Sequence, residues 1–365
     1  MPKPTTIPTI ARPAILRLLA AMLALGVLTG CGSPKPVVTI LTQNLYMGFD
    51  ALALLERPTP PNVEAAFAQV AASDFAARAA ALAEEIAGEP PDLIALQEAV
   101  LFRTQEPGDL LRGNFAPNAT AVAYDFVAIL TDALADRGLT YTIAGAVTNV
   151  DIEMPGVGRD IRLTDRDVIL ARSGPGSRGL RVSNVRGESY AASFAAPGAL
   201  SSIPIARGWV AVDVAIDGAS FRFVTTTLES LEVYAGIAPE VQAAQAGELL
   251  AGPLAGGLPV VFAGDVGSAA AGSGFATPAY GRLTEAGLAD AWAAARPDAD
   301  GFTCCRAPAL DEARSSLDVR LDVVLVRGGF TVADARLVGD EPRTIAGAVR
   351  WPSDHAGVLV RLELP

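Results

Sequence analysis

The stretch "WPSDHAGVLV", residues 351–360, contains the only histidine of this 365-residue chain. Asp354 comes directly before His355, and an apolar run typical of a buried strand follows. Two interpretations are open at this point. His355 is either an ordinary histidine on a surface loop or an acid/base group at the mouth of a strand, because imidazole titrates near neutral pH. The remainder of the sequence has to distinguish them.

Short strand-like runs recur from residue 37 to the C-terminal end, and several alternate polar and apolar residues as a sheet with one covered face does. The runs "PVVFAG" (259–264) and "VVLV" (323–326) are continuously apolar, which is typical of fully buried strands. The predicted strands are 37–45, 91–99, 141–147, 166–172, 208–216, 221–228, 258–265, 320–328 and 357–364.

Helical periodicity predicts helices over 62–88, 125–138 and 239–252. In the first of these, Asn62 is a candidate cap and Gly88 a candidate stop, and Asp74 could instead begin a second helix. Residues 189–204 are small, polar and rich in helix breakers, so we expect a loop there. Many strands with few helices in one long domain predict an α/β fold with two packed mixed β-sheets flanked by helices.

The N-terminal 30 residues are expected to be a signal peptide outside the folded domain. Lys3, Arg12 and Arg17 precede the apolar core "LLAAMLALGVLTG" (18–30), which is short for a membrane span. The sequence "LTGC" (28–31) resembles the bacterial lipoprotein processing box. This resemblance implies cleavage before Cys31, a lipid on its sulfur, a tether over 31–36 and an extracytoplasmic protein anchored to a membrane. The alternative is an ordinary signal peptide with an incidental cysteine.

The charge balance bears on the class of partner. The chain has 28 Lys and Arg against 40 Asp and Glu, and removal of the three leader cations leaves 25 − 40 = −15. An anionic body repels polyphosphate backbones, and no lysine follows Lys35. The composition therefore argues against a general nucleic-acid binder but not against a small phosphate ester. The oligomeric state is not determined by the sequence.

Cys304 and Cys305 form an adjacent pair. Neighbouring α-carbons lie about 3.8 Å apart, which is below the usual disulfide range of about 4.4–6.8 Å. An extracytoplasmic compartment favours an oxidised pair, and two reduced buried thiols are the alternative. Two adjacent cysteines and one histidine do not make the tetrahedral set of a structural zinc site.

Polar residues occur where the predicted apolar strands end or begin. The set comprises Asn44, Glu98, Asp265, Asp322, Asp354 and His355. Each could be an ordinary turn residue, but side chains at strand ends can point into one shared mouth, and an antiparallel neighbour brings its start to that mouth. Asp322 lies inside "RLDVVLV" (320–326), where a charge is costly without a partner. His355 is the candidate partner.

Five motifs occur in the order and style of one known superfamily. They are "TQNL" (42–45), "PDLIALQE" (91–98), "FAGDVGS" (262–268), "RLDVVLV" (320–326) and "WPSDHAGV" (351–358). Over residues 37–365 the chain resembles the endonuclease/exonuclease/phosphatase superfamily, the deoxyribonuclease-I-like metal-dependent phosphoesterases. "GFTCCRAP" (301–308) also resembles secreted bacterial members. The resemblance implies a four-layer α/β sandwich with its site at one end of two packed sheets.

The resemblance also implies a metal site. Glu98 would be the main Mg²⁺ ligand with Asn44 beside it, and Asp354 would complete the network of metal and water. A hard oxygen site suits Mg²⁺, and Mn²⁺ or Ca²⁺ are further candidates. The metal would neutralise charge on the phosphoryl oxygens.

The same resemblance assigns the catalytic roles. His355 would contact the phosphoryl group or transfer a proton, and Asp322 would hold its ring in orientation. Asp265 would position or deprotonate the attacking water. Asn44 would belong to this catalytic set as well as to the metal site.

Two positions depart from the superfamily pattern. Thr227 stands where a histidine is common, and Gly267 stands where an asparagine is common. Thr227 is retained as a candidate substrate-binding residue, and Ser268 is a candidate replacement for the lost amide. Loss of one such donor costs on the order of 10²–10³ in rate.

Three functions therefore remain open. The first is a Mg²⁺-dependent hydrolase of an extracytoplasmic phosphate mono- or diester. The second is a degenerate, non-catalytic member that binds a phosphorylated ligand or a partner, for which Thr227 and Gly267 speak. The third is a secreted nuclease, against which the net charge speaks.

Overall fold

A computed structural model describes residues 1–2, 35–195, 204–230, 239–272, 274–345 and 347–365. Residues 3–30 of the predicted signal peptide, Cys31 and half of the predicted loop 189–204 (residues 196–203) lie outside the described residues. Pro36–Pro365 form one structural unit. Within the described residues, no helix is both long and apolar enough to cross a bilayer.

The first large sheet has eight strands and mixes parallel with antiparallel pairs. Its strands are β1 (Val37–Asn44), β2 (Leu93–Gln97), β3 (Leu101–Gln105), β4 (Ala121–Asp125), β5 (Thr140–Pro155), β6 (Asp160–Ser173), β17 (Thr331–Val338) and β20 (Gly357–Glu363). The order is β17, β20, β1, β2, β6, β3 and β4, and β5 pairs with β6. β1 runs parallel to β2 and antiparallel to β20, so the end of β1 lies beside the start of β20.

The second large sheet has six strands. In spatial order they are β14 (Ala289–Asp290), β16 (Asp322–Arg327), β12 (Val260–Asp265), β11 (Ala219–Thr226), β10 (Gly208–Ile216) and β7 (Arg181–Ser189). β11 and β12 are parallel, and the remaining neighbours are antiparallel. Three small pairs complete the strands: β8 (Phe194–Ala195) with β9 (Pro204–Ile205), β13 (Ala271–Gly272) with β15 (Val319–Arg320), and β18 (Arg343–Ile345) with β19 (Ala348–Arg350).

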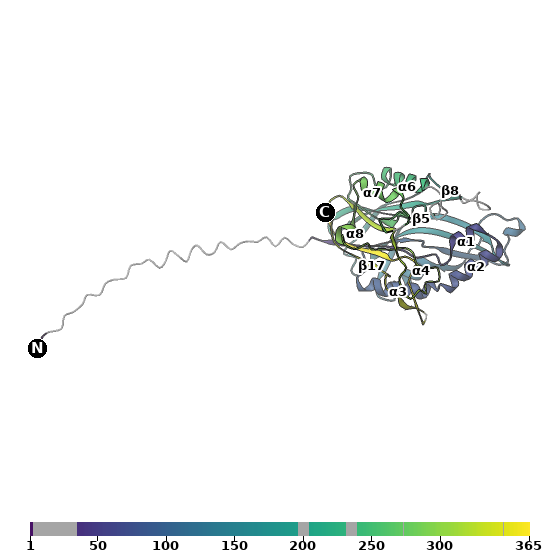
Figure 1. The fold of residues 1–365 in the computed structure, drawn as a ribbon, viewed down its shortest axis with the longest axis horizontal. Coiled ribbons are helices and arrows are strands. Elements are labelled where there is room, and N and C mark those ends of the chain that lie inside the picture. Colours follow the sequence, from purple (N-terminus) through teal and green to yellow (C-terminus); the bar gives the residue numbers. More distant parts are fainter. Residues whose placement is uncertain (3–34, 196–203, 231–238, 273, 346) are drawn as a thin grey trace. The chain divides into compact units, whose positions relative to one another are not determined.

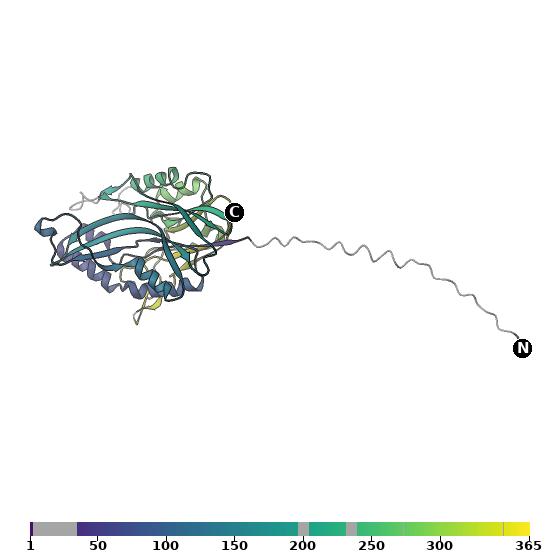
Figure 2. The same cartoon turned by 180° about the vertical axis from the view of Figure 1, so that it is seen from behind.

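The described helices are α1 (Ala51–Glu56), α2 (Pro60–Ala72), α3 (Phe75–Gly88), α4 (Phe126–Ala135), α6 (Glu240–Ala251), α7 (Pro278–Glu285), α8 (Ala291–Ala295) and the 3₁₀ turn η1 (Leu110–Arg112). α2, α3 and α4 cover the outer face of the first sheet, and α6 and α7 cover the outer face of the second (Figures 1 and 2).

Strand alternation produces these layers. On β1, Ile40 faces the second sheet, whereas its neighbour Leu41 faces the helices. β2 alternates in the same way, with Leu93 between the sheets and Ile94 under the helices. Because both faces of the central strands are covered, their inner segments are largely apolar. The prediction of a four-layer α/β sandwich with two packed mixed sheets is confirmed.

The predicted helix over 62–88 is two helices, as the alternative at Asp74 allowed. The Asp74 carboxylate accepts a hydrogen bond from the backbone N–H of Ala77 at 3.2 Å and so caps α3. α2 begins earlier than predicted, at Pro60, and its N-cap is Thr59 rather than Asn62. Proline is favoured in the first turn of a helix because its missing N–H is not needed there.

The two sheets bring the predicted strand-end residues to one end of the sandwich. Asp265, the last residue of β12, is paired directly across from Asp322, the first residue of β16. Thr227 forms an isolated parallel bridge with Asp265. From the first sheet, β1 ends at Asn44, and β20 begins just after His355.

Candidate active site

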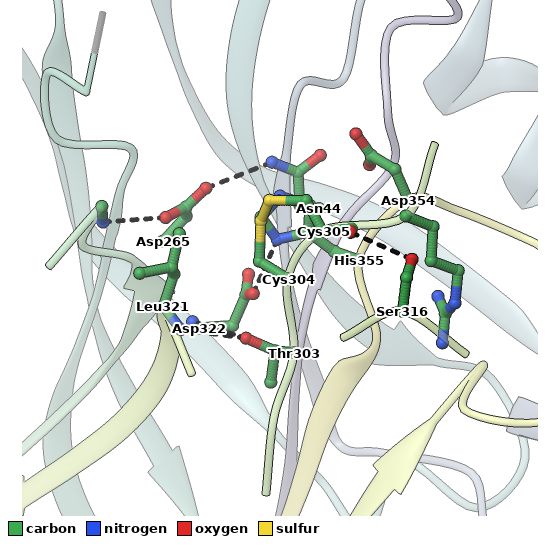
Figure 3. Close-up of a disulfide and its surroundings, with 12 residues drawn as sticks. Asn44, Asp265, Thr303, Cys304, Cys305, Ser316, Leu321, Asp322, Asp354 and His355 are labelled. Carbon is green, nitrogen blue, oxygen red and sulfur yellow. Dashed lines mark hydrogen bonds and ion pairs between the residues drawn. A yellow bond between two sulfur atoms is a disulfide. The ribbon is translucent and has the colours of Figure 1, made fainter. Parts of the chain in front are cut away.

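His355 and Asp322 form a buried pair across the two sheets. Nδ1 of His355 lies 2.7 Å from Oδ2 of Asp322, and the two residues are 5 % and 0 % exposed (Figure 3). Two neighbouring hydroxyl groups hold the backbone of Asp322 and of His355 in place. The hydroxyl of Thr303 accepts the backbone N–H of Asp322 at 3.1 Å, and the hydroxyl of Ser353 accepts the backbone N–H of His355 at 3.2 Å. The buried aspartate in the apolar strand thus has the predicted partner.

The pair has shifted proton affinities. Burial raises the pKa of Asp322 to about 6, even though the charge of His355 acts to lower it. Burial alone lowers the pKa of His355, but Asp322 and the further carboxylates Asp354 and Asp265 outweigh burial and raise it well above its ordinary value. The imidazolium is therefore the favoured state of His355, and Nε2 is the nitrogen left to act on a substrate.

Asn44 links two carboxylates from different sheets. Its side-chain N–H₂ donates to Oδ2 of Asp265 at 3.3 Å (Figure 3). The same N–H₂ donates to Oε1 of Glu98 at 3.2 Å, while the Oδ1 of Asn44 accepts the backbone N–H of Tyr46 at 2.9 Å. In this arrangement the amide nitrogen, not the oxygen, faces the carboxylates. Asn44 therefore holds Glu98 and Asp265 in place, and service as an oxygen ligand requires the amide to turn over.

Glu98 stands just beyond the end of β2 in a strained turn. Its φ of 50° lies in the left-handed region that non-glycine residues rarely occupy. The backbone N–H of Met47 donates to its Oε2 at 2.8 Å. Backbone strain of this kind persists where the surroundings hold a side chain in a required direction. The turn aims the carboxylate into a cavity that Asp354 also lines.

The residues around this cavity fit a divalent metal. Burial and then repulsion from Asp354 raise the pKa of Glu98 to about 8, and burial also raises the pKa of Asp354. The charges of His355, Arg78 and Arg306 offset this burial only in part, so a further cation would favour ionisation of both carboxylates. Carboxylate oxygens are the donors that Mg²⁺, Mn²⁺ and Ca²⁺ prefer. Glu98 and Asp354 would hold the ion, and the ion would supply charge neutralisation at the phosphoryl oxygens.

A second group of potential ligand atoms lies deeper. Atoms of Asp265, Asp322 and His355 lie within 4.8 Å of one another. Since His355 already binds Asp322 through Nδ1, this group serves better as a hydrogen-bonded unit than as a metal cage.

Thr227 is held by Asp167, a residue that the sequence analysis did not select. The backbone N–H and the hydroxyl of Thr227 both donate to Asp167, at 2.7 and 2.8 Å. Burial and then the nearby Asp165 raise the pKa of Asp167 to about 7. Thr227 does line the cavity. While Asp167 is ionised, however, the hydroxyl hydrogen of Thr227 is directed at Asp167 rather than at a substrate.

Arg207 completes this side of the cavity. Its Nη1 lies 3.2 Å from Oδ2 of Asp165 and its Nε 3.5 Å from Oε2 of Glu229, and all three residues are buried. Burial lowers the pKa of Arg207, but Glu229, then Asp165 and Asp167, outweigh burial and raise this pKa beyond its already high value. Among the described residues lining the cavity, Arg207 is the one permanent cation.

The structure does not bring Ser268 to the cavity. Its hydroxyl donates to the backbone oxygen of Thr277 at 3.0 Å and accepts the backbone N–H of Tyr280 at 3.1 Å, and the residue is fully buried. Ser268 therefore fixes the start of α7 and does not replace the missing amide. Gly267 binds inward instead: its N–H donates to Oδ1 of Asp265 at 2.9 Å.

The adjacent cysteines lie against His355. Cys304 and Cys305 are joined as a disulfide, and Sγ of Cys305 lies 3.9 Å from Nε2 of His355 (Figure 3). The hydroxyl of Ser316 donates to the backbone oxygen of Cys305 at 3.3 Å. The pair thus packs behind His355, close to the nitrogen that would meet a substrate, although neither cysteine lines the cavity.

Arg78 is a further residue that the sequence analysis missed. It is fully buried on α3 and donates to the backbone oxygens of Leu45, Tyr46 and Pro352, at 2.8, 3.1 and 2.9 Å. It thereby ties the segment after β1 to the segment that carries Asp354 and His355. An arginine within the apolar helix sequence "FAARAAALA" is the signal that could have indicated it.

With this geometry in place, the chain can be assigned: it belongs to the endonuclease/exonuclease/phosphatase family, whose model matches residues 41–355. Members of this family are usually hydrolases of phosphate esters, and the family is metal-dependent. The predicted resemblance is therefore confirmed at the level of family. A search of curated proteins by sequence finds no match.

Solved structures of the family share the fold at low sequence identity. An endonuclease/exonuclease/phosphatase family protein from Bacteroides thetaiotaomicron is 16 % identical with a TM-score of 0.56, and the alignment covers 90 % of this chain and 95 % of that one. A protein of the same description from Beutenbergia cavernae is 18 % identical with a TM-score of 0.54, covering 90 % and 72 %. The mannosyl-6-phosphatase of Bacteroides thetaiotaomicron VPI-5482 is 16 % identical with a TM-score of 0.53, covering 89 % and 99 %. These likenesses establish the fold alone.

Proposed function

We propose that the protein is a metal-dependent phosphoesterase that hydrolyses a small phosphate mono- or diester by attack of water. The observation that carries the proposal is the His355–Asp322 pair at 2.7 Å, which lies beside Asp265 at the same cavity as Glu98 and Asp354. The cavity therefore joins a protonated imidazole, a carboxylate base and a cation-deficient pair of carboxylates. These are the groups that phosphoester hydrolysis needs.

The residues divide the chemistry as follows. Asp265, fixed by Asn44 and by the N–H of Gly267, is placed to orient the attacking water and take its proton. His355 presents Nε2–H to the phosphoryl oxygens or to the leaving oxygen, and Asp322 keeps the ring oriented and charged. Glu98 and Asp354 would hold the metal, for which Mg²⁺ is the first choice and Mn²⁺ or Ca²⁺ the alternatives.

The direct test is a panel of phosphate esters assayed with the mature protein and each metal in turn, with EDTA as the control. The panel should include mannose 6-phosphate, the substrate class in the name of one structural neighbour, together with aryl, alkyl and nucleoside mono- and diesters. Metal-dependent release of product from any member supports the proposal. Failure of every member with all three metals would refute it.

The rival function is a non-catalytic binder of a phosphorylated ligand, which Thr227 and Gly267 favour. Metal titration by calorimetry, run beside the panel, discriminates the two. Metal binding with turnover supports the enzyme, whereas ligand binding without turnover supports the binder. The nuclease remains disfavoured because five carboxylates line the cavity against the single permanent cation Arg207 among the described residues.

We further propose that the mature protein is extracytoplasmic and anchored through a lipid on Cys31. The motif "LTGC" after the apolar leader supports this placement. Cys31→Ser should move the protein from the membrane fraction to the soluble fraction, as followed by fractionation and by labelling with a fatty-acid analogue. A wild-type protein that is already soluble and unlabelled would contradict the anchor.

A further inference from the structure

The cavity at the site has two chemically different ends. Its volume is about 390 Å³. At one end lie the carboxylates and His355 described above. At the other end the wall is aliphatic and is built from α1, β5, β6 and β9. Its members are Leu52, Leu54, Leu55, Val150, Ile152, Met154, Leu163 and Ile205.

Part of this aliphatic wall is accessible. Leu52, Leu55, Val150 and Ile152 are only half-buried, although each has apolar neighbours in the cavity. Ile205 forms a small cluster with Phe194, against which Leu55 and Val150 pack. The remaining wall residues Leu54, Ile152, Met154 and Leu163 belong to the core beneath the helices of the first sheet. Apolar surface left open to water inside a concave site is typical of a place where a ligand buries an apolar group.

The charges exclude several classes of ligand for this end. A second phosphate group would need a free cation, but Arg207 is already held by Asp165 and Glu229. A nucleobase would need an open aromatic face for stacking. The aromatic residues among the described lining, Tyr46 and Phe49, are only 5 % and 6 % exposed.

We propose that the substrate is a phosphate ester whose organic group is an acyclic apolar chain, with the phosphate at the acidic end and the chain along the aliphatic wall. This inference rests on the proposed function for the position of the phosphate. Leucine, isoleucine, valine and methionine side chains offer no directional hydrogen bonds, so the wall selects by burial of methylene groups rather than by recognition of a polar sugar or base.

Binding of alkylphosphonates of increasing length tests the inference without requiring turnover. Ethyl-, butyl-, hexyl- and octylphosphonate would be titrated into metal-loaded protein by calorimetry, each below the concentration at which it forms micelles. Burial of one methylene should tighten Kd by about fourfold until the wall is filled. A Kd that does not change with chain length would overturn the inference. So would a glucose monophosphate or a nucleoside monophosphate that binds more tightly than octylphosphonate.

Substitutions in the wall supply the matched control. Leu52→Gln and Ile152→Gln should each flatten the dependence of Kd on chain length, and Leu52→Met should preserve it. Ile143→Gln lies on the same strand β5 as Ile152 but at a 57 % exposed position outside the cavity, so it should leave the dependence intact. An equal loss in Ile143→Gln and Ile152→Gln would show that the dependence does not arise in the cavity.

The turnover assay separates this inference from the proposed function. Alkyl phosphates and alkyl p-nitrophenyl diesters of the same lengths should show kcat/KM rising with the chain. If nothing is hydrolysed but the dependence of Kd on length remains, the chain subsite stands and the phosphoesterase proposal fails. If short and long esters are hydrolysed equally and Kd is flat, the reverse holds.

A chain-bearing phosphate ester could reach the site from a bilayer or from solution. Dioctyl phosphatidic acid in solution and long-chain phosphatidic acid in phosphatidylcholine vesicles distinguish the two sources. Binding of either one supports recognition of the chain and identifies its source. Binding of neither one, at concentrations that saturate with octylphosphonate, would overturn the inference for lipid substrates.

Discussion

Buried polar side chains line both sides of the cavity, but their hydrogen-bond and ion-pair partners differ between the two sides. On the His355 side, defined by Asn44, Glu98, Asp322, Asp354 and His355, the residues keep the family pattern and leave groups available to a ligand. On the Thr227 side, defined by Asp165, Asp167, Arg207, Thr227 and Gly267, the polar groups bind one another. The backbone N–H and the hydroxyl of Thr227 both donate hydrogen bonds to Asp167, and Arg207 forms an ion pair with Asp165.

The polar groups of the Thr227 side are therefore engaged with one another. Asp165 and Asp167 are buried there, and Arg207 supplies a compensating charge. Buried carboxylates without such partners would be costly. We therefore expect the groups that act on the charged phosphate of the substrate to lie on the His355 side. The predictions below test this division between the two sides of the cavity.

The largest effect is expected from His355→Ala. If His355 is the catalytic imidazole, the rate should fall by roughly 10²–10⁴ with little change in melting temperature. Asp322→Asn should cause a smaller loss, because Asp322 orients the ring and favours its charged form. The double variant should lose little more than His355→Ala alone, since the two residues act as one unit. Steady-state kinetics of the three variants at saturating metal provide the measurement, and additive losses would contradict the assignment.

Glu98→Gln removes one charge from the metal site while keeping the side-chain shape. The Kd of the variant for Mg²⁺ should rise by about tenfold to a hundredfold. Activity should fall correspondingly at low metal concentration. Calorimetric titration of the metal gives a readout that does not depend on turnover. The matched control is Glu89→Gln, because Glu89 carries its charge outside the cavity, where it pairs with Arg336. Equal metal affinity of Glu98→Gln and the wild type would show that the ion is held elsewhere.

Much of the His355 side could be predicted because its signals are local. A carboxylate inside "RLDVVLV" and a lone histidine at a strand start are visible in the sequence, and the pairing of the two follows from the cost of burying a charge. Asp167 and Arg207 were not selected because their partners are Thr227, Asp165 and Glu229, which are between 22 and 60 residues away in the sequence. The sequence next to Asp167 and Arg207 contains no pattern that predicts those contacts.

The same distinction applies to the fold. The predicted strands 141–147 and 166–172 are the inner parts of the much longer hairpin β5 and β6. The outer part of that hairpin also alternates, with Val150, Ile152 and Met154 separated by polar residues, so its strand character was readable from the sequence. The cross-strand polar pairs that hold it, such as Arg162 with Asp151 at 2.8 Å, become visible only when the partner strand is known.

Gly267→Asn would restore the residue that the family favours and tests whether the Thr227 side can be reverted. Gly267 has a φ of 53°, and a Cβ there would lie 2.9 Å from Nε2 of Gln242 and 3.0 Å from Cβ of Ser230. We therefore expect a loss of roughly 1–3 kcal/mol in stability from overpacking and no gain in rate. Gly267→Ala is the control, since it adds the Cβ without the amide. A tenfold gain in rate by the asparagine variant alone, with unchanged unfolding in urea, would show that the side remains convertible.

The smallest effect on the rate is expected from Asp167→Asn, which should instead change the pH dependence of stability. Burial, and then Asp165, raise the pKa of Asp167 from 3.8 to about 7 in the folded protein, whereas the unfolded chain releases this proton near 3.8. Between these values the folded state binds more protons than the unfolded state, so this group's contribution to stability is full below about pH 4 and is lost as pH rises toward 7. Asp167→Asn should remove that loss, and the stability of the variant relative to the wild type should rise across the window by at most about 1.4 kcal/mol per pH unit. Urea unfolding at several pH values measures the difference, with Asp136→Asn as an exposed control. Parallel pH profiles for Asp167→Asn and the wild type would mean that Arg207 keeps Asp167 ionised throughout, and the Thr227 side would then be a fixed ion network rather than one that holds a proton.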